Sequence, residues 1–103
     1  MRTVKVFTLG VYAGDLVELE KGSSYSFIYD KDYKGEPVSL TMPLKQKQFV
    51  YENFPPFFEG LLPEGVLLES LIRHTKTDRN DFLSLLITTG QDLVGAVTVE
   101  ETE

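Results

Sequence analysis

The sequence contains no cysteine and only one histidine, His74. The lack of cysteine excludes disulfide bonds and cysteine-ligated metal sites, and a single histidine cannot form a histidine cluster. No window approaches the roughly 18 consecutive apolar residues that a membrane-spanning helix needs. The N-terminal run MRTVKVFTLG has too short an apolar part for a signal peptide, and no small-residue cleavage site follows it. We therefore expect a cytoplasmic protein without a metal site or a membrane segment.

Clusters of positive charge are also missing. The 10 Lys and Arg residues are outnumbered by 16 Asp and Glu residues, which gives a net charge of −6. Lys45 and Lys47 come nearest to a basic cluster, and their polar surroundings indicate a solvated loop. Binding to phosphate groups requires clustered Lys and Arg, so we expect no direct contact with nucleic acid.

Signatures of catalysis are absent from the sequence as well. Gly10 and Gly14 are too far apart for a phosphate-binding loop, and no G-x-S-x-G motif occurs. His74 could be combined with a serine and an aspartate, but a chain of this size offers such a set by chance. Glu59 and Glu64 flank a predicted helix start, where carboxylates complement the helix dipole. We expect no enzymatic activity, no catalytic residue and no cofactor.

The 103 residues predict one domain, 1–103, that opens with strands. Met1 to Leu19 has the pattern of a β-hairpin with a turn at Gly10, and Gly14-Asp15 is a candidate bulge or bend. In the segment 25–30, aromatic residues alternate with other residues, which predicts a strand with an aromatic face. Further strands are predicted at 38–42 and 93–99, with an acidic, frayed tail at 100–103. The segment 44–53 is compatible with either a polar loop or a short strand.

The most informative stretch is Phe54 to Arg73, FPPFFEGLLPEGVLLESLIR. Pro63 suits the first turn of a helix, and Gly65 is unusual there because it lowers helix propensity and allows close backbone approach. Apolar residues at three- and four-residue spacing predict one apolar helix face. These residues are Val66, Leu67, Leu68, Leu71 and Ile72. The start of this helix either packs on the chain's own sheet or is offered to another molecule.

A second amphipathic helix is predicted after the connector 75–80. Asp78 and Asp81 resemble a capping pair, and Gly90 is placed to end the helix. Its apolar face is formed by Phe82, Leu85, Leu86 and Thr89. The predicted fold class is α+β, with a small antiparallel or mixed sheet of about five to six strands packed against two to three short helices.

Four segments of the chain, taken together, resemble the N-terminal subdomain of the HipA family. They are PVSLTMPL at 37–44, FFEGLLPE at 57–64, FLSLL at 82–86 and GQDLVGAV at 90–97. HipA-family proteins are bacterial serine/threonine kinases that act as toxins of type II toxin–antitoxin systems. Their ATP-binding and catalytic motifs lie after this subdomain, whereas this sequence ends at EETE. The resemblance therefore does not imply kinase activity here.

The resemblance implies a HipS-like antitoxin, the separate small protein of tripartite HipBST systems. Such a protein binds and neutralises a HipT-like kinase, and a HipB-like helix-turn-helix protein belongs to the same system. A structural subunit that completes the kinase fold, or bridges the kinase to the HipB-like protein without inhibiting it, is the alternative.

We expect the start of the first helix to form the partner-binding site. Val66 either enters the kinase active-site cleft or packs in the domain's own core. Some relatives carry a bulky aromatic residue at this position, so inhibition could instead hold the kinase lobes in an unproductive arrangement. The residues expected at the contact are Leu62, Pro63, Glu64, Gly65, Val66 and Leu67.

Overall fold

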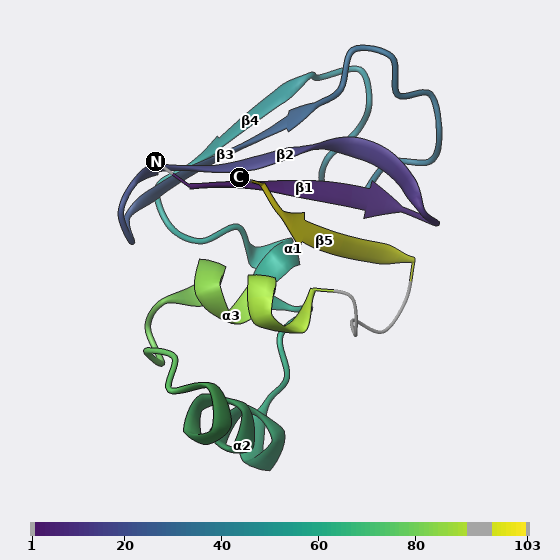
Figure 1. Cartoon of the computed structure of the whole chain (residues 1–103). Coiled ribbons are helices and arrows are strands. Elements are labelled where there is room, and N and C mark those ends of the chain that lie inside the picture. Colours follow the sequence, from purple (N-terminus) through teal and green to yellow (C-terminus); the bar gives the residue numbers. More distant parts are fainter. Residues whose placement is uncertain (1, 91–95, 103) are drawn as a thin grey trace.

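A five-stranded antiparallel sheet forms one layer of the protein, and helices cover one of its faces (Figure 1). The computed structural model describes residues 2–90 and 96–102. The strand order is β4-β3-β2-β1-β5. The elements are β1 (Thr3–Thr8), β2 (Val11–Glu20), β3 (Ser24–Tyr29), β4 (Gln48–Tyr51), α1 (Pro56–Glu59), α2 (Gly65–Thr75), α3 (Phe82–Thr89) and β5 (Val97–Glu101). The predicted α+β class is confirmed.

The predicted N-terminal hairpin is confirmed as β1 and β2, joined by a two-residue turn at Leu9-Gly10. The register shifts after Val6, which leaves Ala13 as the extra residue of a bulge. Gly14, next to it, lies so close to β3 that a Cβ atom would be 2.3 Å from the Ile28 carbonyl oxygen. The expected irregularity near Gly14 therefore lies one residue earlier, and the glycine allows two strands to approach.

The core lies between the helix-covered face of the sheet and the helices α1 and α3. On β3, Tyr25, Phe27 and Tyr29 are all less than 4% exposed, so the predicted aromatic face is the core face. The Phe27 and Phe58 ring centroids are 5.8 Å apart, which joins α1 to the sheet. The core is completed from α3 by Leu83, Leu85 and Leu86.

The strand predicted at 38–42 is wrong, because this segment forms turns. Tyr29 explains the difference, since its hydroxyl donates to the Met42 carbonyl at 2.6 Å and accepts from the Val38 amide at 2.9 Å. A side chain thus forms the hydrogen bonds to backbone groups that a neighbouring strand would form in a sheet. Pro37 and Pro43 flank the segment and cannot donate to a ladder. The apolar pattern reflects burial of Val38 and Met42 in a turn.

Three other predictions are refined by the structure. Within 44–53, the strand alternative is correct for Gln48–Tyr51. The double proline starts the short helix α1, which was not predicted, with Pro56 in its first turn. The last strand was predicted at 93–99, of which 93–95 lie outside the described residues. It extends to Glu101, so the first half of the expected frayed tail is strand.

Candidate protein-binding site

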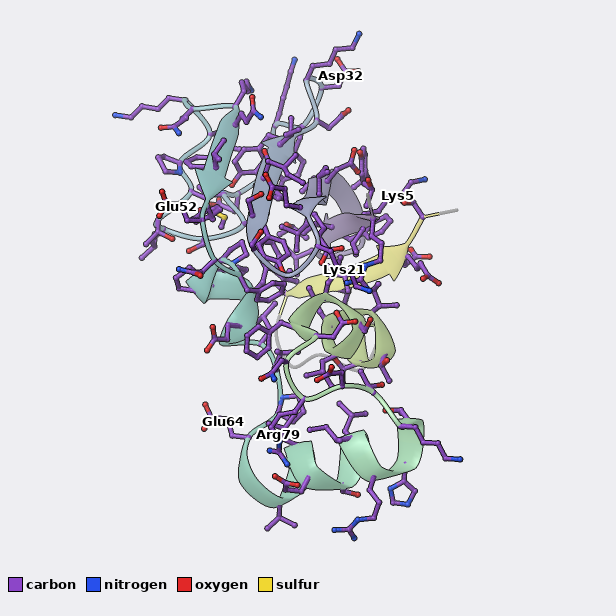
Figure 2. The ribbon with its side chains drawn as sticks, turned by 90° about the vertical axis from the view of Figure 1, so that its left-hand side faces the viewer. Lys5, Lys21, Asp32, Glu52, Glu64 and Arg79 are labelled. Carbon is purple, nitrogen blue, oxygen red and sulfur yellow. The ribbon has the colours of Figure 1, made fainter. Side chains whose placement is uncertain are left out.

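Helix α2 lies apart from the sheet, below α1 and α3 in Figure 1. Figure 2 shows it at the end of the molecule opposite Asp32. None of its side chains is buried. Leu68, Leu71 and Ile72 are half-buried against the core cluster, whereas Val66 is 83% and Leu67 71% exposed. The predicted apolar face is therefore divided, and the first turn displays two large apolar side chains to solvent.

The backbone around Gly65 explains how α2 begins. Glu64 is the N-cap residue in an extended conformation, and Gly65 follows with a φ of +59°. Most other residues would be strained at this φ, while nothing lies within 4 Å of a Cβ built on Gly65. Glycine is therefore favoured at position 65 because the backbone turns there with a positive φ. The close backbone approach that we expected is not observed. Pro63 was predicted to lie in the first turn of the helix. It instead precedes the N-cap residue.

The six residues expected at the contact lie in different environments. Leu62 is only 9% exposed and belongs to the core, and Pro63 is half-buried. The other four are exposed. We call Glu64, Gly65, Val66 and Leu67 the α2 tip. The exposure of Val66 rules out the alternative in which it packs in the domain's own core.

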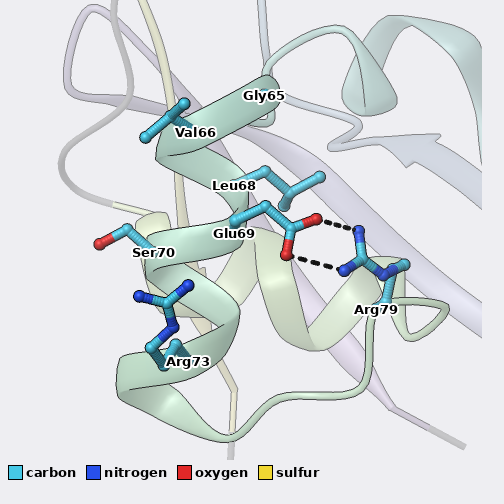
Figure 3. A pocket seen from close by; sticks show the side chains of 7 residues that line it. All are labelled: Gly65, Val66, Leu68, Glu69, Ser70, Arg73 and Arg79. Carbon is cyan, nitrogen blue, oxygen red and sulfur yellow. Dashed lines mark hydrogen bonds and ion pairs between the residues drawn. The ribbon is translucent and has the colours of Figure 1, made fainter.

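An open groove of 820 Å³ runs along α2 beside the α2 tip. Figure 3 shows Val66 on one side of the helix and, on the other, the ion pair between Glu69 and Arg79, with N–O distances of 2.6 and 2.8 Å. The Arg79 hydrogen bond holds the pKa of Glu69 below its ordinary value. The groove is lined by Gly65, Val66, Leu68, Glu69, Ser70, Arg73 and Arg79. Apolar side chains with a charged rim suit a protein contact.

The described residues offer no candidate metal site. No group of three His, Asp or Glu side chains there is placed to hold a metal ion. His74, at the other end of α2, is exposed, and its Nδ1 lies 2.8 Å from the Ser70 carbonyl oxygen. None of the helices α1 to α3 is long and apolar enough to cross a membrane.

A charged cluster between the sheet and the start of α3 was missed by sequence reasoning. Arg2 makes two 2.9 Å hydrogen bonds to Glu18 on β2, one of 2.8 Å to Asp81 and one of 2.6 Å to the Ser84 hydroxyl. Asp81 also caps α3 by accepting from the Ser84 amide. The cluster thus fastens α3 to the sheet. Its members are far apart in the sequence, so no local pattern indicates it.

Arg2 lowers the pKa of both carboxyl groups in this cluster. Its hydrogen bonds hold the pKa of Glu18 below the ordinary value, although burial raises it. Burial also raises the pKa of Asp81, but the hydrogen bonds from Arg2 and Ser84 outweigh it. Stability from both groups is therefore present above their ordinary pKa values, about 4, and is lost as the pH falls through the lower folded-state values.

We predict that Arg2→Gln lowers the free energy of unfolding by about 2 kcal/mol at pH 7, after allowing for solvent screening of the partly exposed guanidinium. The Glu18 side chain, only 4% exposed, would lose its ionic partner. Urea denaturation from pH 7 to pH 3 would measure the difference from wild type, which should shrink below about pH 4. Arg79→Gln is the control, because it breaks an exposed pair and should cost no measurable stability. A difference that stays constant with pH would refute this role of Arg2.

Comparisons with known proteins found similarity to a family model, to a bacterial protein and to a solved structure. A family model described as the HipA N-terminal domain matches residues 4–100. An uncharacterised protein of Haemophilus influenzae is 36% identical over 101 residues, which cover 98% of this chain and 93% of the relative. A solved structure described as the N-terminal domain of HipA toxin has a TM-score of 0.80 at 33% identity, covering 100% of this chain and 94% of that chain.

Proposed function

This chain belongs to the HipA N-terminal domain family, and from this premise we propose that it is a HipS-like antitoxin that binds and neutralises a HipT-like serine/threonine kinase in the cytoplasm. The antitoxin acts in trans and performs no catalytic step of its own. A HipB-like helix-turn-helix protein joins the same complex and provides the contact with DNA.

The size of the Haemophilus influenzae relative supports an action in trans. The match covers 93% of that relative, so a protein of nearly this size carries the module in Haemophilus influenzae. A domain of this family that is separate from a kinase must use an exposed surface to bind one. Such a surface needs a few well-placed apolar anchors within a charged rim.

The exposed α2 tip is the observation that carries the proposal. Val66 and Leu67 leave large apolar surfaces in water, at a cost of about 25 cal/mol per Å² that burial in a partner would recover. Arg73 and the ion pair between Glu69 and Arg79 supply charge beside them. In the complex, the α2 tip enters the active-site cleft of the kinase and blocks substrate binding or closure of the lobes.

The net charge of −6 supports the choice of partner. A nucleotide-binding cleft of a kinase attracts phosphate groups, so it presents positive potential to an approaching protein. Opposite charge accelerates association, and salt weakens this effect. We therefore expect the association rate constant to fall as ionic strength rises.

Measurement of kinase activity tests the function directly. The rate of phosphoryl transfer from ATP by the purified HipT-like kinase would be compared with and without an excess of this protein. The proposal predicts loss of most of the kinase activity, and growth of cells that express both proteins but not of cells that express the kinase alone. Binding with unchanged or raised activity would contradict the antitoxin role and would favour a structural subunit. Absence of binding would refute both.

A further inference from the structure

The turn between β1 and β2 places a leucine in an unfavourable backbone conformation. Leu9 has a φ of +52° and Gly10 a φ of +81°. Positive φ at both central residues of a two-residue hairpin is the pattern of a type I′ turn, in which Asn, Asp or Gly are strongly preferred. The Cβ atom makes left-handed conformations costly for other residues. Leucine at the first central position of this turn therefore destabilises the folded state relative to Asn, Asp or Gly.

Packing against residues 2–90 and 96–102 does not explain why Leu9 is there. Its side chain is 77% exposed, and Val11, at the start of β2, is 58% exposed. The Leu9 amide donates to the Ala96 carbonyl at 2.8 Å, which fixes the turn against the residue before β5. That bond uses only the backbone, so an asparagine or glycine would keep it. Leu9 thus carries both a conformational and a solvation cost, and no contact of its side chain with the described residues offsets them.

The surroundings of Leu9 indicate what kind of surface would cover it. Residues 6–14, VFTLGVYAG, contain no charged side chain, although 25% of the whole sequence is charged. A second copy of this chain is disfavoured, because two molecules with a net charge of −6 repel each other. The complementary surface is an apolar pocket on a different protein of neutral or positive surface charge.

We propose that the β1–β2 turn is a second anchor that inserts Leu9 into an apolar pocket of the kinase. This inference rests on the proposed function, which supplies the partner. The turn lies at one end of the sheet, whereas α2 lies below the helical layer (Figure 1). The longest dimension of the domain is 39 Å, so one larger partner can contact both. Leu9 contributes to affinity, while the α2 tip blocks the kinase.

Leu9→Asn tests this proposal because it should change stability and binding in opposite directions. Asparagine tolerates positive φ, so the variant should avoid the energetic cost of a left-handed leucine. In a domain of this size, we expect this to raise Tm of the free protein by about 4–8 °C. We expect the Kd for the kinase to rise about tenfold. Leu40→Asn is the matched control, since Leu40 is 97% exposed and has no positive φ. It should leave both Tm and Kd nearly unchanged.

Calorimetric unfolding and binding titrations with full-length chains would give both quantities. A stabilised Leu9→Asn variant that binds the kinase as tightly as wild type would overturn the second anchor and leave the antitoxin function intact. Equal weakening by Leu9→Asn and Leu40→Asn would also overturn it, because the effect would not be specific to the turn. Failure of the wild-type protein to bind the kinase would refute the proposed function itself.

Discussion

Val66→Asp combined with Leu67→Asp is expected to abolish neutralisation of the kinase while the domain stays folded. Each of these side chains is a candidate anchor, and removal of an anchor typically costs about 2 kcal/mol or more of binding free energy, which is about thirtyfold in Kd. Aspartate at either position would also place an unpaired charge in a desolvated contact. Titration of kinase activity with the double variant would measure the loss.

The fold should tolerate both substitutions. Val66 and Leu67 are 83% and 71% exposed, so little internal packing is removed. They lie in the first turn of α2, where a carboxylate interacts favourably with the helix dipole. Leu40→Asp is the matched control for loss of an exposed leucine, and the corresponding double Asn variant separates loss of apolar surface from gain of charge. Full neutralisation by the folded double Asp variant would refute the role of the α2 tip.

Phe58→Ala is expected to cause the largest loss of stability, about 3–5 kcal/mol in the free energy of unfolding. Phe58 is fully buried on α1, with its ring centroid 5.8 Å from Phe27 and 5.2 Å from Phe57. It therefore links the short helix to the sheet. Because domains are stable by only about 5–15 kcal/mol, this loss would leave part of the population unfolded near physiological temperature.

Phe57→Ala is the control for this prediction, since Phe57 is next to Phe58 but only half-buried. Chemical denaturation of the two variants should place the midpoint of Phe58→Ala well below that of Phe57→Ala. Equal denaturation midpoints for the two variants would contradict the account in which Phe58 packs α1 onto the core.

The sheet and α3 could be predicted because their signals are local. The alternation along β3 follows from burial of one strand face. Asp81 caps α3 by accepting a hydrogen bond from the amide of Ser84, three residues further on. The false strand at 38–42 and the missed helix α1 show the limit of local signals. In the segment 38–42, a tyrosine hydroxyl from β3 forms the hydrogen bonds to backbone groups that a neighbouring strand would otherwise form. Helix α1 begins at two prolines.

The candidate site is a proposal made from the sequence, and the sequence could not decide which of its side chains are exposed. Helical spacing is the same whether an apolar residue faces the core or solvent, so Leu68 and Val66 look alike in the sequence. Only the position of α2, apart from the sheet, distinguishes them. Leu62 was expected at the contact and lies in the core. The strain at Leu9 left no signal either, because φ depends on the turn that the register imposes.

The most direct test of the central claim is a kinase titration with two proteins side by side. The rate of phosphoryl transfer by the HipT-like kinase would be measured against increasing concentrations of wild-type protein and of the Val66→Asp, Leu67→Asp variant. Saturating inhibition by the wild type, with little or no inhibition by the folded variant at the same concentrations, is the predicted result. A kinase rate that is unaffected by the wild-type protein, although the two proteins bind, would contradict the claim.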